Sequence, residues 1–421
     1  MSKPDPVPRP TSGDDALAHI FLGEEGLQDP SPYYRYMREE APMHRSANGA
    51  IFLSQYDDCR EVLRDNRLGK STTNESLLSS GDPEAAQVRK DQQMKAVEEN
   101  HAASMLFLNP PAHTRQRALV SRAFTPRRVE ALRASIRTLA EGMVDEFVEA
   151  GGGDLLDALA FPLPVAVIGT MVGVPEADWP QFRSLITATA AGLEPAATAD
   201  DLREGYAAHA VVRCYFQDLV AERKANPADD LLSGLIQVAD GDDRLSDNEI
   251  VAVTTLLFAA GFETTTNMIG NGMGALLRHP DQMARLWNNS SLLNPAVEEM
   301  LRWDSPVQLD GRTVLEAAEV AGEPVEVGTR VMTLLGAANR DPKHFEDPER
   351  FDITRDEGPP MSFGSGIHYC LGANLARAET QELFGAMIKR CKTVEQTGEL
   401  RNRRRITLRG YLSVPVTVTA S

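Results

Sequence analysis

A long, mainly apolar stretch of the chain begins at Ile250 and reads I-V-A-V-T-T-L-L-F-A-A-G-F-E-T-T-T-N-M-I-G-N. Ser246, followed three residues later by Glu249, forms the capping-box pattern that opens a helix. The middle of this helix breaks local rules, because Gly261 is a poor helix former and Glu263 is an acid among apolar neighbours. Such conflicts concentrate at functional sites. We therefore predict a long, buried, locally bent helix whose middle carries chemistry.

Three consecutive threonines follow Glu263, namely Thr264, Thr265 and Thr266. β-Branched residues are unfavourable in a helix interior, and a threonine hydroxyl can bond back to a carbonyl one turn earlier. We expect this back-bonding to loosen the helix at this point.

A second helical pattern follows a glycine-rich loop near the C-terminus. Its apolar positions recur on one helical face: Leu375, Leu383, Phe384, Met387 and Ile388. The loop before it, with Gly364 and Gly366, presents one cysteine, Cys370. The positive end of the helix dipole should favour the thiolate there. A single cysteine would need three distant partners to bind zinc, whereas one thiolate suffices as the protein ligand of a haem iron.

The remaining patterns predict a mainly α-helical chain with a smaller β-rich region. Helices are expected near residues 29–40 and 56–65 with a short strand between them, and short strands near residues 313–330 and 405–419. Residues 1–20 read as an extended, Pro-rich arm, and residues 69–104 as a long polar segment without clear structure. Residues 158–175 are apolar, but internal prolines favour a buried helix over a membrane span.

Composition narrows the functional classes. The chain has 421 residues, 43 basic and 61 acidic side chains, and a net charge of −18, which disfavours binding to nucleic acid or to an anionic membrane. Length alone suggests two or three domains. The four cysteines are few and widely spaced, and no signal peptide opens the chain, so a reducing cytoplasm fits.

One segment reverses the overall acidity. Between residues 112 and 138 seven arginines stand against Glu130 alone: Arg115, Arg117, Arg122, Arg127, Arg128, Arg133 and Arg137. Solvated helix faces explain such a run, and so does a docking patch for an acidic redox partner. Both interpretations stay open. In the same segment Asn109 is expected to cap a helix with Pro110 in its first turn, which puts His113 and Arg117 on one face, suited to a carboxylate or phosphate.

Several of these motifs carry a family resemblance. F-x-x-G-x-H-x-C-x-G, from Phe363 through Gly366, His368 and Cys370 to Gly372, resembles the haem-ligand signature of the cytochrome P450 family. N-P-P-A-H-T-R-Q-R resembles the family's D-P-P-x-H-T-x-x-R helix, with asparagine in place of the usual aspartate. A-G-F-E-T-T, V-E-E-M-L-R and P-E-R-F resemble three further family motifs in the family's order.

The resemblance assigns expected roles to individual residues. Cys370 becomes the axial ligand of haem b (iron protoporphyrin IX), in a loop that includes Phe363 and Gly364. Four side chains are expected on the haem propionates: His113, Arg117, Arg312 and His368. Glu263 and Thr264 become the acid–alcohol pair that delivers protons during oxygen activation, and Ala260 and Gly261 allow close approach of the haem. Glu299, Arg302 and Arg350 become a structural ion-pair group, and the expected substrate pocket is Leu256, Ala259, Ala260, Leu309 and Leu408.

The resemblance also implies the whole architecture and reaction. We expect one catalytic domain over residues 1–421, with haem held between the long central helix and the helix after the cysteine loop. The implied enzyme is a bacterial-type monooxygenase that inserts one atom of O₂ into a C–H or C=C bond of a small, mostly apolar substrate. Its electrons would come from a ferredoxin supplied by an NAD(P)H-dependent reductase. We expect a cytoplasmic monomer that binds neither membrane nor nucleic acid.

Three alternatives remain at this level. A peroxygenase would use hydrogen peroxide without a redox partner, although family members of that kind lack the acid–alcohol pair. A haem-thiolate protein that only binds a ligand or recruits an enzyme is the second. A zinc hydrolase built on His368 and Cys370 is the third.

Overall fold

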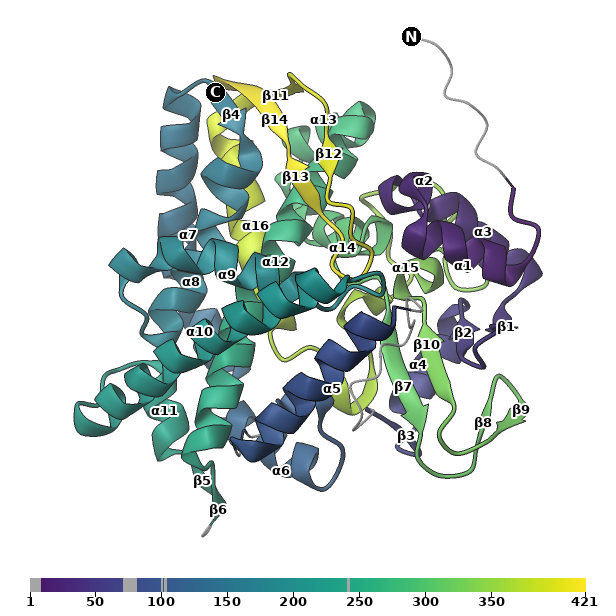
Figure 1. The fold of residues 1–421 in the computed structure, drawn as a ribbon. Coiled ribbons are helices and arrows are strands. Elements are labelled where there is room, and N and C mark those ends of the chain that lie inside the picture. Colours follow the sequence, from purple (N-terminus) through teal and green to yellow (C-terminus); the bar gives the residue numbers. More distant parts are fainter. Residues whose placement is uncertain (1–8, 71–81, 100, 102–103, 241–242) are drawn as a thin grey trace.

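The computed structural model describes residues 9–70, 82–99, 101, 104–240 and 243–421. Figure 1 shows two parts that differ in secondary structure. Long helices, among them α7, α10, α12 and α16, make up the larger part, and a sheet containing β7 and β10 lies beside the N-terminal helices in the smaller part. The predicted fold class, mainly α with a smaller β-rich region, is confirmed.

The helices have the following bounds: α1 Gly13–Leu22, α2 Glu24–Gln28, α3 Ser31–Glu40, α4 Tyr56–Arg64, α5 Pro83–Glu98, α6 Ala112–Ala123, α7 Pro126–Glu149, α8 Pro162–Val172, α9 Trp179–Ala191, α10 Ala199–Ala225, α11 Leu231–Gln237, α12 Asp247–Arg278, α13 Pro280–Asn288, α14 Leu293–Trp303, α15 Leu335–Ala338 and α16 Ala373–Arg390. The helices expected near residues 29–40 and 56–65 are therefore α3 and α4.

The strands are β1 Met43–Arg45, β2 Ile51–Leu53, β3 Leu68–Gly69, β4 Gly152–Asp154, β5 Ala239–Asp240, β6 Asp243–Arg244, β7 Asp310–Val314, β8 Ala318–Val320, β9 Glu323–Val325, β10 Arg330–Thr333, β11 Cys391–Gln396, β12 Arg401–Asn402, β13 Tyr411–Ser413 and β14 Pro415–Ala420. The largest sheet has the order β1-β2-β10-β7-β3, in which only the β2–β10 pair is parallel. A second sheet, β11-β14-β4, joins the C-terminus to the turn after α7. Both short-strand predictions are confirmed.

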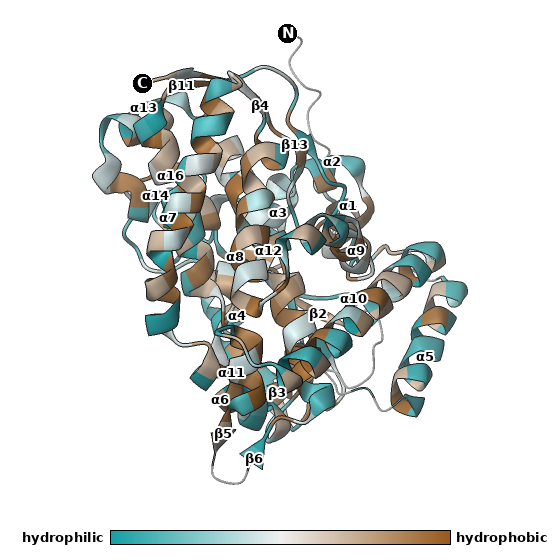
Figure 2. Cartoon of the chain, turned by 90° about the vertical axis from the view of Figure 1, so that its left-hand side faces the viewer, coloured by the Kyte–Doolittle hydropathy of each residue, from teal (hydrophilic) through white to brown (hydrophobic). Residues whose placement is uncertain are grey.

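Helix α12 is the central element of the larger part. It begins where the sequence predicted, with both hydrogen bonds of the Ser246–Glu249 capping box present. It packs against α8, α10, α14 and α16, and most of its residues are buried. Figure 2 shows hydrophobic colours along α8 and α12, whereas α5 lies at the periphery beside α10. The α12 residues Phe258 and Phe262 join an edge-to-face cluster with Phe182 and Phe216.

Two predictions about irregular segments need correction. The arm expected over residues 1–20 is helical from Gly13, because Ser12 caps α1 and three apolar side chains, Ala16, Leu17 and Ile20, are buried. Residues 1–8 lie outside the described residues. The segment expected to lack structure over residues 69–104 contains α5, which buries only Ala85 and therefore shows little apolar periodicity. Residues 71–81, 100, 102 and 103 of that segment lie outside the described residues.

The expected cap of the next helix is also wrong. Helix α6 begins at Ala112, two residues after Pro110, which was expected in its first turn. The Asn109 side chain therefore does not cap the helix and is used elsewhere. Its Oδ1 accepts from the Lys70 backbone N–H at 2.7 Å, and its Nδ2 donates to the Lys70 carbonyl at 2.8 Å. Asn109 thus holds the end of β3 against the start of α6. This bond brings Lys70 into the region described below.

The apolar segment of residues 158–175 contains α8, which is buried along nearly its whole length. Within the described ranges, the chain offers no helix with the length and apolarity to span a bilayer.

Candidate functional site

The loop that precedes α16 places Cys370 close to the start of that helix. Gly364 and Gly366 adopt positive φ angles of 68° and 70°, which side-chain-bearing residues rarely adopt. At Gly366 a Cβ atom would stand 2.1 Å from the Leu63 carbonyl oxygen, so glycine is also required for packing. The backbone N–H of Cys370 donates to the Phe363 carbonyl at 3.0 Å. The loop is therefore a tight structure that holds the cysteine in one place.

The Cys370 residue is exposed, but the protein around its sulfur still changes the pKa of the thiol. Desolvation raises the pKa of its thiol, and this outweighs the backbone N–H groups of Gly372 and Ala373 and the nearby Arg117 guanidinium, which lower it. In the polypeptide alone, the net shift has the opposite sign to the one that the helix dipole predicted. A cation bound to the sulfur would reverse it, because a coordinating thiol is deprotonated.

Near this loop lies a cluster of buried nitrogen groups, which we call the donor cluster: His113, His368, Arg312 and Lys70. The rings of His113 and His368 are 4.2 Å apart between centroids. Four buried nitrogens of the cluster make no hydrogen bond: both ring nitrogens of His113, Nε2 of His368 and one terminal nitrogen of Arg312. A buried polar atom without a partner indicates strain, a bound water or a ligand, and here four such nitrogens gather in one place.

The charges of the donor cluster have one sign except at Asp310. Lys70 and Arg312 both pair with its carboxylate, and they hold the pKa of Asp310 well below its usual value although burial alone would raise it. Burial, followed by the positive charges of Lys70 and Arg312, lowers the pKa of His368 to about 3. Burial, with Arg117 next, lowers the pKa of His113 as well. An additional anion would relieve this accumulation of positive charge.

The donor cluster and the accessible Cys370 together fit haem, which carries two propionates and an iron that accepts a thiolate. Arg117 does not join the cluster through a hydrogen bond, since it donates to the Tyr369 carbonyl at 2.7 Å, beside the cysteine. The Arg377 guanidinium carbon lies 4.4 Å from the centroid of the Phe363 ring. Phe363 also packs next to α14. No sequence motif marked Lys70, which its contacts with Asn109 and Asp310 hold at this place.

The middle of α12 has the predicted back-bonding. The Thr264 hydroxyl donates to the Ala260 carbonyl at 2.7 Å, and the Thr265 hydroxyl donates to the Gly261 carbonyl at 3.0 Å. Ala260 is exposed and Thr264 half-buried, although the helix is buried on both sides of them. At Gly261 a Cβ atom would lie 3.0 Å from Ile168, so this glycine also makes room for α8, and its expected closeness to haem stays a prediction.

Glu263 has a partner that sequence reasoning missed. Its side chain is 4% exposed and forms an ion pair with Arg403, whose side chain is 13% exposed. Arg403 follows β12, 140 residues further along the chain. No local pattern marks an arginine as the partner of so distant an acid.

The predicted structural ion-pair group is present with one substitution of partner. Glu299 and Arg302 form a two-pronged pair at 2.6 and 2.8 Å, and both side chains are almost fully buried. Arg350 is wrong as the third member, because its side chain is 59% exposed and pairs with Asp352. Arg355 takes that position, with its Nε 3.3 Å from Glu299 and its side chain 8% exposed. The backbone carbonyl of Arg350 still accepts from Arg302.

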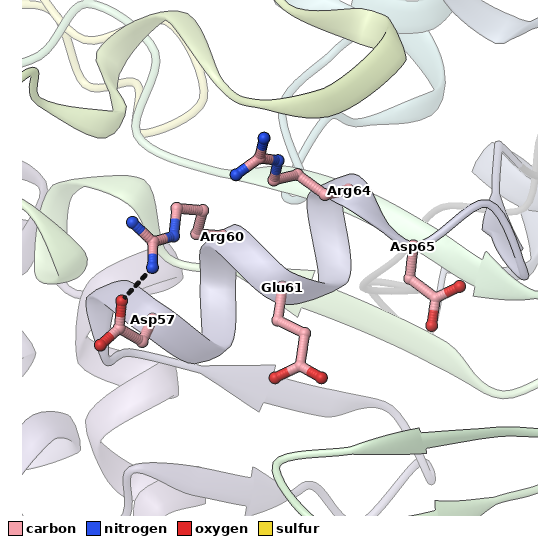
Figure 3. Close-up of a pocket in the computed structure, with 5 residues that line it drawn as sticks. All are labelled: Asp57, Arg60, Glu61, Arg64 and Asp65. Carbon is pink, nitrogen blue, oxygen red and sulfur yellow. Dashed lines mark ion pairs between the residues drawn. The ribbon is translucent and has the colours of Figure 1, made fainter.

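The expected pocket residues are spread over three elements. Leu256 and Ala259 lie half-buried on α12, and Leu309 is buried in the cluster under the N-terminal helices. Leu408 forms an isolated bridge with Val307. None of them lines the pocket shown in Figure 3, a surface hollow on α4 whose walls are Asp57, Arg60, Glu61, Arg64 and Asp65. Those charged walls do not suit an apolar substrate.

Most of the arginines in the basic segment have partners inside the molecule. Arg115 pairs with Asp243 and Glu249, and Arg133 and Arg137 pair with Glu382 on α16. Arg122 and Arg128 donate to backbone carbonyls, and Arg127 is exposed. The run of arginines therefore mainly ties α6 and α7 to α12 and α16.

Comparison with known proteins supplies the family context. The family model described as Cytochrome P450 matches residues 70–413. Two curated relatives are each 38% identical to this chain: the cytochrome P450 monooxygenase PikC of Streptomyces venezuelae (94% of this chain, 92% of the relative) and the vitamin D(3) 25-hydroxylase of Pseudonocardia autotrophica (95% and 96%). The crystal structure of P450BioI in complex with hexadec-9Z-enoic acid ligated acyl carrier protein superposes with a TM-score of 0.84 at 32% identity, over 94% of this chain and 99% of that one.

These similarities bear on the alternatives left open by the sequence. Among the residues that the structure describes, no three His, Cys, Asp or Glu side chains gather as metal ligands, so the zinc hydrolase has no ligand set there. The P450 fold expected from the resemblance is confirmed by the match of the solved structures over nearly the whole chain.

Proposed function

The chain belongs to the cytochrome P450 family and is a P450 monooxygenase with a haem-iron cofactor, and from this premise we propose that it inserts one atom of O₂ into a C–H or C=C bond of a small, mostly apolar organic molecule. For a C–H bond, the reaction consumes RH, O₂, two electrons and two protons and yields ROH and water. The observation that carries the proposal is the accessible Cys370 beside buried donors that lack partners. Haem, when bound, supplies the oxygen-activating chemistry.

We assign the binding of the cofactor to particular side chains. Cys370 would provide the thiolate ligand of the haem iron, and His113, His368, Arg312 and Lys70 would hold the propionates, whose charge would satisfy the unpaired nitrogens of the first three. We also assign Arg117 to the haem site, on the side of the cysteine loop, where it donates to the Tyr369 carbonyl. Haem b is the form we propose, because a single thiolate and a set of propionate donors require no covalent attachment.

Replacement of Cys370 by alanine tests this assignment. We expect Cys370→Ala to lose the visible absorption of the ferrous carbon monoxide complex and all oxidative turnover, while the far-ultraviolet circular dichroism changes little. Cys214→Ala is the matched control, because Cys214 is an exposed free cysteine on α10. A Cys370→Ala protein that stays red and active would refute the proposal, and a pyridine haemochrome spectrum identifies the haem type.

Glu263 and Thr264 are the proposed route for protons. The Thr264 hydroxyl is half-buried on α12, one turn after the exposed Ala260, and the Glu263 carboxylate is adjacent in sequence. Thr264→Ala should lower the amount of product formed per O₂ consumed by roughly tenfold, because the positioned proton donor would be lost. The readout is the ratio of product to O₂ under NADPH-driven turnover. Turnover with peroxide alone that Thr264→Ala leaves undiminished would favour the peroxygenase.

The expected pocket residues and the names of two relatives support a proposal for the substrate class. Leu256, Ala259 and Ala260 offer small or apolar surfaces on α12. One relative is named for vitamin D(3), and one solved relative carries a hexadecenoic acid, so both names describe extended, mostly apolar molecules. We propose a substrate of this character. A screen of such compounds for a low- to high-spin shift in the haem absorption tests it, and a screen in which only small polar compounds respond would refute it.

A ferredoxin supplied by an NAD(P)H-dependent reductase is the proposed electron donor, and a monomer in the cytoplasm is the proposed state. The four cysteines are free thiols, as expected in a reducing compartment. Internal pairing of Arg115, Arg133 and Arg137 leaves the exposed Arg127 as the arginine of this segment most available to an acidic donor. Reconstitution with a ferredoxin at varied ionic strength tests the proposed electron donor. Light scattering tests the monomeric state, and cell fractionation tests the cytoplasmic location.

A further inference from the structure

The segment from the end of β12 up to β13, residues 402–410, which we call the C-terminal loop, contacts several distant parts of the molecule. Arg403 pairs with Glu263 on α12, and Arg409 pairs with Asp304 after α14. Arg409 also donates to the carbonyls of Leu27 and Gln28 near α2. On another side, the loop meets the connection between α9 and α10, residues 192–198. It is a junction of parts far apart in the sequence.

Glu194 holds the loop from the α9–α10 connection. Its carboxylate accepts three backbone N–H groups, from Ile406 at 3.0 Å, Thr407 at 3.2 Å and Leu408 at 3.3 Å. The Thr407 hydroxyl donates to the Leu193 carbonyl at 3.3 Å. A carboxylate bonded to three successive N–H groups fixes the backbone more firmly than a side-chain contact would, because charge-assisted bonds are the stronger class.

Arg403 holds the loop from the other side. Its own backbone N–H donates to the Gly410 carbonyl at 2.8 Å, which closes the loop, and its guanidinium reaches the buried Glu263. The Nε of Arg403 is buried without a partner, so the ion pair with Glu263 accounts for the orientation of the head group. Only Arg404 and Arg405 separate Arg403 from the part of the loop that Glu194 grips.

We propose that Arg403 is a positioning residue for Glu263. Because Glu194 binds the same loop, the position of Arg403 also depends on whether the α9–α10 connection is packed against that loop. This proposal rests on the proposed proton route through Glu263 and Thr264. Packing of the α9–α10 connection against the C-terminal loop thereby determines whether Arg403 stays paired with Glu263, the acid in the proposed proton route.

The physical basis is the sensitivity of a buried acid to its counter-charge. In a low-dielectric interior the attraction between two charges depends steeply on their separation, and an acid that loses its cation is driven toward its neutral form. A carboxyl group passes protons on only while it is held within hydrogen-bond reach of the next group, so loss of the arginine that orients Glu263 would impair the relay. The C-terminal loop is short enough for the release of residues 406–408 to shift Arg403.

A purely structural role would have a different signature. The pair of Glu299 and Arg302 illustrates it: breaking such a pair lowers stability and leaves no specific mark on proton delivery. The measurement that separates the two roles is the product formed per O₂ consumed, together with the solvent isotope effect on turnover.

The experiment compares Arg403→Met, Arg403→Lys, Glu194→Ala and Arg404→Ala in the haem-loaded protein. Arg403→Met should lower product per O₂ roughly tenfold and change the solvent isotope effect, and Arg403→Lys should recover much of the loss because it keeps the charge. Glu194→Ala should produce the same change in smaller size, roughly threefold. Arg404 is the matched control, because its pair with Glu24 is on the surface, with both side chains 69% exposed.

Hydrogen exchange of the same proteins gives a readout that needs no turnover. Glu194→Ala should speed exchange in residues 402–410 and in α12 around Glu263, whereas Arg404→Ala should not. Faster loop exchange in Glu194→Ala with unchanged α12 exchange and unchanged product per O₂ would overturn the coupling. An Arg403→Lys protein as poorly coupled as Arg403→Met would overturn the role of the charge. Haem-loaded wild-type protein that makes no product from any substrate would instead count against the proposed function, and the exchange comparison would still stand.

Discussion

Two buried polar regions of this molecule differ in how completely the protein satisfies them. Around Glu299 and Arg302, charges of opposite sign meet, and the Arg302 guanidinium also bonds the carbonyls of Asn339, Pro348 and Arg350. In the donor cluster, positive or nitrogen-bearing groups gather around the single carboxylate of Asp310, and four nitrogens make no bond. In the first region only Arg355 Nε lacks a hydrogen bond, and it still lies 3.3 Å from the Glu299 carboxylate, whereas the unpaired nitrogens of the second region lie among positive groups that suit an anionic ligand. Satisfaction of hydrogen bonds thus separates a structural group from a binding site.

The largest predicted effect breaks the first region. Glu299→Gln leaves the buried Arg302 guanidinium without its counter-charge, so the free energy of unfolding should fall by about 3–5 kcal/mol. Urea denaturation followed by circular dichroism measures it, with Glu298→Gln as the neighbouring control on a pair at the edge of α16. A loss below about 1 kcal/mol, the usual value of a surface pair, would contradict the structural role.

A smaller effect separates Arg355 from Arg350. Arg355→Ala removes a nearly buried guanidinium that pairs with Glu299 and Glu357, so the free energy of unfolding should fall by about 2 kcal/mol. Arg350→Ala should change it by less than about 0.5 kcal/mol, because that side chain is largely exposed. The same denaturation measurement decides the pair. If Arg350→Ala proved the more harmful, the third member predicted from P-E-R-F would be reinstated.

The smallest predicted effect has the opposite sign and lies in the second region. His113→Phe removes two buried nitrogens that have no partner, so the haem-free protein should become more stable by about 1 kcal/mol. The same variant should retain haem less well, because one donor to the propionates is lost. Unfolding of the haem-free protein and transfer of haem to apomyoglobin measure the two effects. A haem-free variant less stable than wild type would mean that His113 is a structural residue.

Local patterns were sufficient for much of the fold and of the site. The capping box at Ser246 and the apolar run after it predicted the start of α12, and the glycines around Cys370 predicted a tight loop before α16. The back-bonding of Thr264 and the pair of Glu299 with Arg302 were also predicted, because each joins residues within one helical turn. Helix α5 was missed because it buries a single residue, so its apolar periodicity is weak.

Residues that act across long separations were beyond local patterns. Lys70 reaches the donor cluster through Asn109, whose side chain was expected to cap a helix, and Arg355 takes the place of Arg350 beside Glu299. Arg403 meets Glu263 only because the C-terminal loop folds back onto α12.

By itself the sequence determined most of the elements, the cysteine loop and the family resemblance, since these depend on spacing within a few helical turns. Only the tertiary structure decided which charges meet, which nitrogens lack a partner and how the α9–α10 connection grips the C-terminal loop. Burial and pairing are properties of residues brought together from distant parts of the chain, and no local spacing specifies them.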